Sequence, residues 1–562
     1  MSVEKLIVDH IDTWTTALQT RSTAGRGSSG KIDLYGIKKL RELILELAVR
    51  GKLVPQDPND EPASVLLKRI AAEKAELVKQ GKIKKQKPLP KISDEEKPFE
   101  LPEGWEWTRF GNIFKVSSGD ALTSNQMNTL GEYPVYGGNG INGYHDSYNV
   151  AKRTLVIGRV GYYCGSIHIT PNHAWVTDNA FITHFSESNF DLDYVEILLK
   201  ATNLKEDESA TAQPVISGRK IYPIVLAVPP LEEQRKIAKK TYELLGLCTH
   251  LEQHSLTSLD AHQQLVETLL TTLTDSQNAD ELAENWARIS EHFDTLFTTK
   301  ASIDALKQTI LQLAVMGKLV PQDPNDEPAS ELLKRIAQEK AQLVKDGKMK
   351  KQKPLLPISD EEKPFELPEG WEWSRLDHVA SKITDGDHKT PPRIAEGYKL
   401  LSAKNIRDGF LDYENCDYIS ESSYIKSRER CLPEKGDLLI VSVGGTIGRS
   451  SLITGDCEFA LVRSVAIIKP LIIESNFLKI AMDSQLLQSM IHSHKRGGAQ
   501  PCLYLGEISK FLFPVPPLKE QKRIVKTVNI FMGILETLTL AFKSAQQTQF
   551  HLADALTDAA IN

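Results

Sequence analysis

The sequence predicts an α+β fold: two mixed α/β domains are separated by long antiparallel coiled-coil helices and related by a pseudo-two-fold internal repeat. The segment 37–110 recurs at 303–376 without a gap, and between Leu47 and Trp107 the copies agree at 53 of 61 positions. The segments that follow the two copies share little except scattered apolar runs and glycines. A helix with seven-residue periodicity then follows each of them. We call the repeated parts frames and the divergent parts inserts.

These boundaries divide the 562 residues into five parts. Residues 1–99 hold the first helical frame and a linker, and residues 100–230 form the first insert. Residues 231–365 form a central frame, in which a long coiled-coil helix leads to the second repeat copy. Residues 366–517 form the second insert, and residues 518–562 form the C-terminal coiled-coil helix.

Each frame is predicted to contain two helices and a linker. Residues 40–49 have helical spacing of apolar side chains, and Gly51 follows at a C-cap position. Residues 66–77, rich in Ala, Glu, Lys and Leu, predict the second helix. The basic stretch 79–91 and the acidic stretch 93–96 are expected to be solvated linkers rather than a phosphate-binding arm. The same pattern recurs 266 residues later.

The sequence pattern of the inserts is typical of mixed α/β domains, because short β-rich runs are broken by glycine. The expected strands are 133–136, 154–157 and 221–228 in the first insert, and 436–441, 461–469 and 511–515 in the second. Irregular loops connect these runs. Because loops on a rigid scaffold commonly carry binding specificity, we expect recognition to reside there.

A proline pair and a long helix close each insert, at Pro229-Pro-Leu-Glu-Glu-Gln234 and Pro516-Pro-Leu-Lys-Glu-Gln521. Nine of ten heptad positions after the second pair are apolar: Ile524, Val528, Phe531, Leu535, Leu538, Phe542, Ala545, Gln549, Leu552 and Leu556, with Gln549 the exception. The same register after the first pair selects Ile237, Thr241, Leu244, Cys248, Leu251, Ser255, Ser258, His262, Leu265 and Leu269. The two helices are therefore expected to pair with each other. Antiparallel pairing turns a direct repeat in sequence into an inverted pair in space.

The composition indicates an ordinary soluble protein, with 41% hydrophobic and 25% charged residues. The net charge of −6 does not indicate nucleic-acid binding, although local basic clusters decide such affinity. Six scattered cysteines without a C-x-x-C pair argue against a zinc cluster or a disulfide framework. With no signal peptide and no apolar run of membrane length, we expect a cytoplasmic protein.

Motifs that resemble catalytic or cofactor sites lack their required context. Gly138 to Gly143 match G-x-G-x-x-G, but no helix is expected to follow. Gly25 to Lys31 nearly spell a phosphate loop, yet Ile32 replaces the hydroxyl that binds magnesium. No Asn or Asp-Pro-Pro-aromatic tetrad for adenine methylation, no His-Glu-x-x-His and no separated nuclease triad occurs. The chain is expected to bind rather than catalyse, with no metal or cofactor of its own.

The entrances Phe99 to Trp107 and Phe365 to Trp373, the Pro-Pro-Leu-x-Glu-Gln exits and the long helices resemble the specificity subunit of Type I restriction-modification systems. This resemblance implies that each insert is a target recognition domain for one half of a bipartite, asymmetric site in double-stranded DNA. It also implies that the frames dock two methyltransferase subunits and that two restriction subunits join the complex. S-adenosylmethionine, ATP and Mg²⁺ would then be bound by those partners.

Candidate DNA-contacting residues are polar or basic and lie beside glycine turns. They are Asn139, Asn142, Arg159, Tyr162 and Gln213 in the first insert, and Lys404, Asn405, Arg407, Arg449, Lys495, Arg496 and Gln500 in the second. Arginine favours guanine edges, Asn and Gln favour adenine edges, and Lys mostly meets phosphate. Two alternatives remain: a DNA-binding scaffold outside restriction, and a nuclease or methyltransferase with an unrecognised site.

Overall fold

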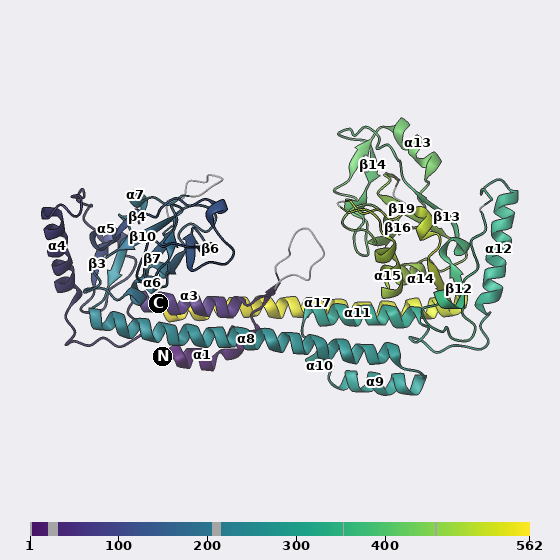
Figure 1. Cartoon of the computed structure of the whole chain (residues 1–562). Coiled ribbons are helices and arrows are strands. Elements are labelled where there is room, and N and C mark those ends of the chain that lie inside the picture. The colour runs from purple at the N-terminus through teal and green to yellow at the C-terminus, as the bar shows by residue number, and fades with distance from the viewer. Residues whose placement is uncertain (1–2, 21–31, 205–214, 352, 456–457, 499) are drawn as a thin grey trace. The chain divides into compact units, whose positions relative to one another are not determined.

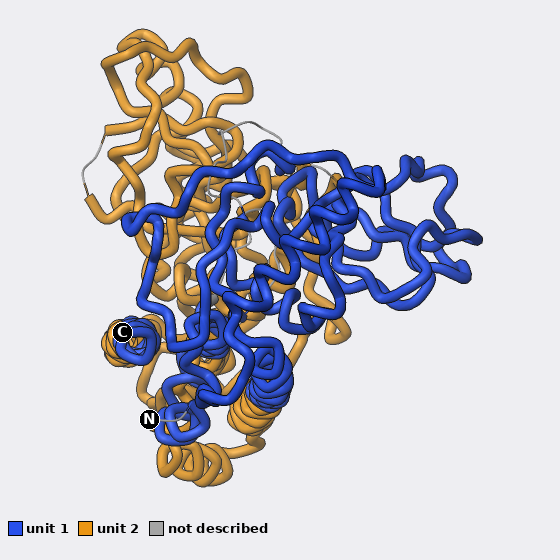
Figure 2. Tube along the Cα trace, turned by 90° about the vertical axis from the view of Figure 1, so that its left-hand side faces the viewer, with its two compact units in different colours: residues 1–21, 31–257, 546–562 blue, residues 22–30, 258–545 orange. Residues whose placement is uncertain are grey.

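A computed structural model describes residues 3–20, 32–204, 215–351, 353–455, 458–498 and 500–562. The chain divides into two compact units (Figure 2). Unit 1 comprises residues 1–21, 31–257 and 546–562, and unit 2 comprises residues 22–30 and 258–545. The candidate Gln213 and most of the phosphate-loop-like segment lie outside the described residues.

The frames contain the predicted helices. In unit 1 these are α3 (Tyr35–Val49) and α4 (Ala63–Lys79), and in unit 2 they are α11 (Lys300–Val315) and α12 (Ala329–Lys345). Helices that were not predicted precede them: α1 (Val3–Asp9) and α2 (Ile11–Thr16) in unit 1, and α9 (Ala279–Glu291) and α10 (Phe293–Leu296) in unit 2. The glycines that follow α3 and α11 have positive φ, 67° at Gly51 and 71° at Gly317, a conformation that favours glycine. A Cβ at Gly51 would also lie 2.5 Å from the Pro102 ring. Both glycine C-caps are therefore confirmed.

The first insert is built on three small sheets. At its base, β3 (Glu106–Arg109) pairs with β11 (Val225–Val228) in antiparallel fashion. A four-stranded sheet has the order β4 (Lys115–Ser118), β10 (Ala180–His184), β7 (Leu155–Gly158) and β8 (Ile167–Ile169). A three-stranded sheet has the order β6 (Gly140–His145), β5 (Tyr133–Gly137) and β9 (Trp175–Val176). The helices α5 (Phe110–Ile113), α6 (Leu192–Ala201) and α7 (Gly218–Ile221) also belong to it (Figure 1).

The second insert repeats this topology strand for strand. At its base, β12 (Glu372–Arg375) pairs with β20 (Leu512–Val515). Its four-stranded sheet has the order β13 (Ala380–Asp385), β19 (Val465–Pro470), β16 (Leu438–Val441) and β17 (Ser450–Leu452). Its three-stranded sheet has the order β15 (Asp417–Ile419), β14 (Tyr398–Leu401) and β18 (Phe459–Leu461). The one parallel pairing also recurs, as β5 with β9 and β14 with β18. The second insert's helices are α13 (Glu421–Arg430), α14 (Ser475–Asp483), α15 (Gln485–His494) and α16 (Leu505–Ile508). Two sequences with little in common therefore form one fold.

Two long helices follow the inserts, α8 (Leu231–Asp275) and α17 (Leu518–Ile561). The first part of α8 shares unit 1 with the last turns of α17, and the remainder of α8 shares unit 2 with the first part of α17. This distribution is the one expected of antiparallel helices. Leu244 and Cys248 of α8 are buried in the same core cluster as Ala553 of α17.

The predicted seam register is wrong in the second half of each helix. Ser258 and Ala545 are exposed, as are Leu265 and Leu552. The buried positions there are one residue later and include Val266, Leu270, Ala553 and Thr557. A straight α-helix drifts by about 20° per heptad relative to a 3.5-residue repeat, so the predicted positions leave the seam after about three heptads.

Helix α17 also contains an 18-residue stretch with a mean hydropathy of 1.5, which has the length and composition of a membrane span. No such stretch was expected from the sequence. The helix places Ile524, Val528 and Leu535 in the core of unit 2 and exposes Ile530 and Ile534. One helix of this kind is weak evidence for a membrane span, so this stretch does not assign the chain to a membrane.

The acidic stretch 93–96 is exposed to solvent, as expected, but one of its carboxylates also holds the linker to the insert. Glu96 forms an ion pair with the guanidinium of Arg109 at 2.9 Å, and the Arg109 side chain is almost fully buried. The same guanidinium donates to the carbonyl oxygens of Pro90 and Pro223. The Ser93 amide and Arg109 lower the pKa of Glu96. Glu362 and Arg375 repeat the ion pair at 2.8 Å, so each linker is fastened to its entrance strand.

Candidate nucleic-acid interface

The entrance and exit motifs meet at the base of each insert. The Trp105 indole N–H donates to the Glu233 carboxylate at 3.0 Å, and the Gln56 side chain donates to the same group at 3.1 Å. Burial raises the pKa of Glu233. Gln322 and Glu520 repeat one of these bonds in unit 2, also at 3.1 Å. The repeated motifs thus close each insert onto its frame.

The exit glutamine connects the same base to the insert's helix. The Gln234 side chain donates to the carbonyl oxygen of Pro229 at 3.1 Å and accepts from the backbone amide of Asp191 at 3.0 Å. Gln521 makes the equivalent bonds, to Pro516 and Glu474, at 2.9 Å each. Since Asp191 and Glu474 immediately precede α6 and α14, both inserts are held in equivalent positions on their frames.

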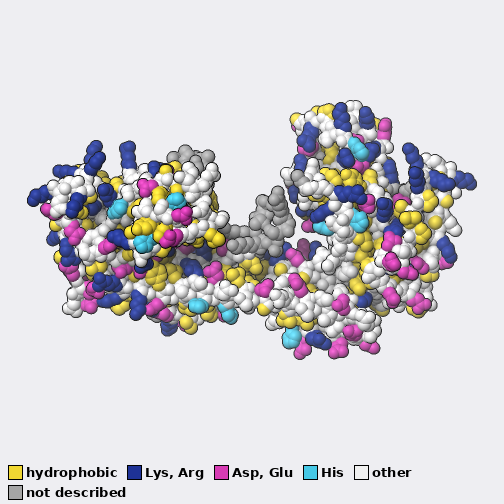
Figure 3. All heavy atoms as spheres, viewed as in Figure 1, with side chains coloured by type: hydrophobic (Ala, Val, Ile, Leu, Met, Phe, Trp, Pro, Cys, Tyr) yellow, Lys and Arg dark blue, Asp and Glu magenta, His cyan; other side chains and the backbone are white. Residues whose placement is uncertain are grey.

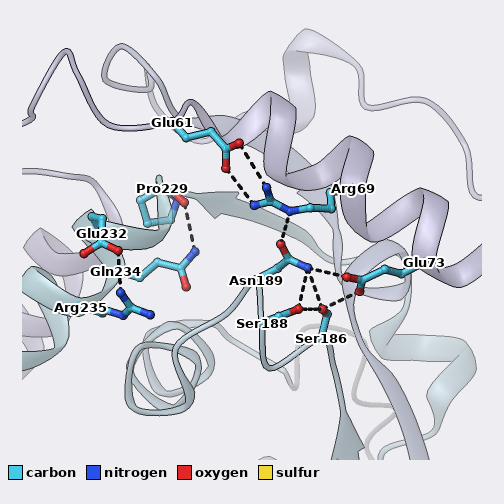
Figure 4. Close-up of polar contacts among 10 residues, drawn as sticks. All are labelled: Glu61, Arg69, Glu73, Ser186, Ser188, Asn189, Pro229, Glu232, Gln234 and Arg235. Atoms are coloured by element: carbon cyan, nitrogen blue, oxygen red, sulfur yellow. Dashed lines mark hydrogen bonds and ion pairs between the residues drawn. The ribbon is translucent and has the colours of Figure 1, made fainter.

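A second set of polar contacts fastens α4 to the first insert (Figure 4). Arg69 pairs with Glu61 at 2.8 Å and donates to the Asn189 side chain at 2.6 Å. Glu73 accepts from Asn189 at 3.0 Å and from Ser186 at 2.6 Å. In unit 2 the residue equivalent to Asn189 is Ile472. Each of the two lies two positions before the residue whose backbone amide donates a hydrogen bond to the exit glutamine. The frame residues Arg335 and Glu339 are retained there, and Arg335 still pairs with Glu327 at 2.7 Å.

We expect Glu73→Ala to destabilise the contact between α4 and the first insert by about 1–2 kcal/mol, because the buried Asn189 amide loses an acceptor. Hydrogen exchange at residues 186–191 should rise. Glu339→Ala is the matched control, since Ile472 offers this equivalent residue no side-chain amide, and it should leave exchange in unit 2 unchanged. Equal responses of the two variants would contradict the assigned role of Asn189.

The first insert brings three of its predicted residues to one edge. Asn139 lies exposed in the turn between β5 and β6, and this turn packs on the loop between β7 and β8, where Ser166 Oγ donates to Gly138 O at 2.9 Å. Arg159 begins that loop and Tyr162 lies near its middle with 81% of its surface exposed. The glycine-rich segment is therefore a hairpin turn that leads into β6, and no helix follows it, as expected.

Arg159 is held in place by its neighbours. Its guanidinium donates to Ser118 Oγ at 3.0 Å and to the Asp178 carbonyl at 3.4 Å, and it lies 5.2 Å from the centroid of the Phe181 ring. Its Nε is buried and has no hydrogen-bond partner among the described residues. Asn142 is exposed on β6, outside the turn.

The second insert gathers its basic candidates at the equivalent edge. Arg449, near the end of the loop between β16 and β17, lies 3.8 Å from Asp408 and donates to the carbonyl oxygen of Ile406 at 3.5 Å. This contact places it beside the segment that carries Arg407. On the other side of the loop, Val443 bridges to Cys502, which pairs with Arg496. Lys495 and Gln500 are exposed in this second segment.

Several candidates are already engaged within the insert: Arg407 and Arg496 pair with Asp412 and Glu507, each at 3.6 Å. The Asn405 side chain is fully buried; it accepts from the Ser402 amide at 3.0 Å and donates to the carbonyl oxygens of Asp412 and Asn415. Its hydrogen bonds therefore stabilise the conformation of its own loop. Lys404 is exposed but pairs with Asp417 at 3.1 Å. Sequence reasoning did not single out Tyr163, which is 53% exposed and stacks edge-on against Tyr162.

Exposed lysine and arginine side chains are scattered over both inserts rather than gathered in one continuous basic patch on the face shown in Figure 3. Within the described ranges, no group of three or more His, Cys, Asp or Glu residues is placed to hold a metal ion. The edges described above consist of amides, guanidinium groups and aromatic rings. This chemistry suits hydrogen bonding and stacking with nucleic acid.

Comparison with known proteins finds a matching family model and similar chains. A family model described as the Type I restriction modification DNA specificity domain matches residues 102–261 and 368–541. The Type I restriction enzyme EcoAI specificity subunit of Escherichia coli is 51% identical, and the EcoEI specificity subunit of the same species is 47% identical, each over the full length of both chains. A solved structure from work on the assembly and conformational transition of the type I R-M system covers 83% of this chain and 99% of its own, at 17% identity and a TM-score of 0.44. The chain therefore belongs to the Type I restriction-modification DNA specificity family, as a non-catalytic specificity subunit with two target recognition domains.

Proposed function

We infer that each insert reads one half of a bipartite, asymmetric DNA site. The observation that carries this inference is the shared topology of two inserts whose sequences differ. The common backbone provides equivalent edges, whereas the side chains at these edges differ, with Tyr162 and Tyr163 in one and Gly445 and Thr446 in the other. Two domains that share a backbone fold but present different side chains suit two different half-sites. The recognition domains would comprise residues 100–230 and 366–517.

The proposed DNA-contacting set follows from exposure and position. It comprises Asn139, Asn142, Arg159 and Tyr162 in the first insert and Lys404, Arg407, Arg449, Lys495, Arg496 and Gln500 in the second. Asn405 is left out because its amide is buried and fully used. Gln213 stays a candidate from the sequence alone. Arginines beside the loops would read guanine edges and lysines would meet phosphates.

The frames would dock the catalytic partners. Their near-identical sequences and equivalent closures support one methyltransferase subunit on each frame, and two restriction subunits would join the full complex. S-adenosylmethionine, ATP and Mg²⁺ would be bound by these partners, which would methylate adenine. The complex would act in the cytoplasm, where DNA is present.

The experiment that tests this proposal compares the purified chain with its complex. The chain alone should transfer no methyl group from labelled S-adenosylmethionine to DNA, whereas the complex with its modification subunits should do so. Native mass spectrometry of that complex should give two methyltransferase subunits per chain. Methyl transfer by the chain alone, or a single methyltransferase subunit at saturation, would contradict the proposal.

A further inference from the structure

The loop between β7 and β8 and the loop between β16 and β17 have the same length and the same backbone. The strand pair Ile157–Ile167 closes the first loop, and the strand pair Ile440–Ser450 closes the second. We call residues 158–166 and 441–449 the reading loops. Their sequences, Gly-Arg-Val-Gly-Tyr-Tyr-Cys-Gly-Ser and Val-Ser-Val-Gly-Gly-Thr-Ile-Gly-Arg, share only two glycines and one valine.

These two shared glycines explain how the loops fold alike. Gly161 and Gly444 have φ of 93° and 108°, and Gly165 and Gly448 have φ of 82° and 91°. This part of φ space disfavours other residues, so the glycines impose the chain path. In each loop the second glycine's amide donates across the loop, from Gly165 to Gly158 O at 2.7 Å and from Gly448 to Val441 O at 3.0 Å.

Each loop is anchored on one side and exposed on the other. Cys164 is fully buried, and its counterpart Ile447 packs against the core of unit 2. The first loop pairs with a neighbouring segment through Val160 and Val215, and the second does so through Val443 and Cys502. The two residues between the first glycine and the anchor face solvent: Tyr162 and Tyr163 in one loop, Gly445 and Thr446 in the other.

The exposed pair in the first loop is not explained by packing. Tyr162 is 81% exposed and its ring lies edge-on to that of Tyr163, with 5.0 Å between ring centroids. A tyrosine ring has faces that stack on bases and a hydroxyl that hydrogen-bonds to base edges or phosphates. Arg159, at the start of the same loop, adds a positively charged donor.

We propose that these loop tips determine specificity, each within its own half-site: Tyr162 and Tyr163 for the first insert, Gly445 and Thr446 for the second. The inference rests on the proposed function and deepens it, because it names the backbone element that carries interchangeable reading residues. The anchor and the glycines fix the loop, and the two tip residues vary without affecting the fold. A bulky aromatic tip and a small tip then present different surfaces to the same part of a half-site.

The test uses the complete complex with its modification subunits, after its methylated site has been mapped. Methyl transfer is measured on duplexes in which each base pair of either half-site is substituted in turn. In Tyr162→Ala, discrimination should fall about tenfold or more at one or more positions of the first insert's half-site. Discrimination at the other half-site should stay the same. Tyr163→Ala is a second variant for the same assay.

The matched control is Tyr148→Ala, since Tyr148 is also exposed but packs on Tyr133 and His173, away from the loop. It should leave discrimination unchanged. If both loop variants discriminate like the wild type at every position, or lose rate uniformly on all duplexes, the inference is wrong even though the proposed function holds. If instead the wild-type complex does not discriminate at any base pair, the proposed function itself fails.

Discussion

Exchanging residues 110–224 for the corresponding insert of a family member with a different mapped site should replace one half of the methylated motif and leave the other half unchanged. The cut points keep β3 and β11 with the frame, where Phe110 N donates to Ile224 O at 2.7 Å. They also keep Trp105, Glu233 and Gln234, which close the insert.

This exchange has the largest expected effect on recognition because an entire half-site is replaced. Each wrong base pair in a specific site costs about 1–3 kcal/mol, so several together abolish methylation of the old site. The measurement is a genome-wide map of methylated adenines in cells that carry the chimera with its partners. A change in both halves would show that the inserts do not read independently.

The largest expected effect on stability comes from Trp105→Ala. Trp105 is 5% exposed and belongs to the core of unit 1, so truncation should destabilise that unit by about 3–5 kcal/mol. The change also removes a hydrogen bond from the buried Glu233 carboxylate. Hydrogen exchange, followed peptide by peptide, should increase in unit 1.

Trp371→Ala provides the matched comparison, since Trp371 is also 5% exposed and lies in the core of unit 2. It should increase exchange in unit 2 and leave the frame and insert of unit 1 protected. If Trp105→Ala left exchange in unit 1 at the wild-type rate, the tryptophan would serve a docking partner rather than the insert's closure.

The frames were predictable from the sequence because their signals are local. Helical periodicity and Gly51 gave α3 and its end, and the repeat gave the second copy at once. The acidic linker is exposed as expected, but charge alone did not reveal its buried partner: Arg109, to which Glu96 pairs, lies 13 residues further along the chain. Long-range pairs of this kind are visible only in three dimensions.

The seams of the long helices show a different limit. The heptad register identified the helices correctly but failed beyond the third heptad, where the buried face shifts by one residue in both. In α8 the less exposed positions at the shift are Leu251, Ser255 and Leu259. In α17 they are the equivalent Leu538, Phe542 and Gln546, each 287 residues later. A strict 3.5-residue repeat does not describe helices of this length.

The common fold of the inserts was not predictable, because strand order depends on contacts between distant segments. The positions of glycines indicate part of this common fold, because Gly161 and Gly165 match Gly444 and Gly448 in φ and in spacing. Of the candidate contacts, Asn405 shows how composition misleads, since an amide beside a glycine turn is as suited to holding a loop as to reading a base.

We propose that the two frames are equivalent and that each insert reads its own half-site. A chain in which residues 110–224 of the first insert and 376–511 of the second are interchanged tests this most directly. Frame 2 retains Glu327, Arg335 and Glu339, so the contacts of Asn189 can form there. Because the repeat has pseudo-two-fold symmetry, the account predicts the same methylated motif as in the wild type. A methylation map with a different motif would contradict it.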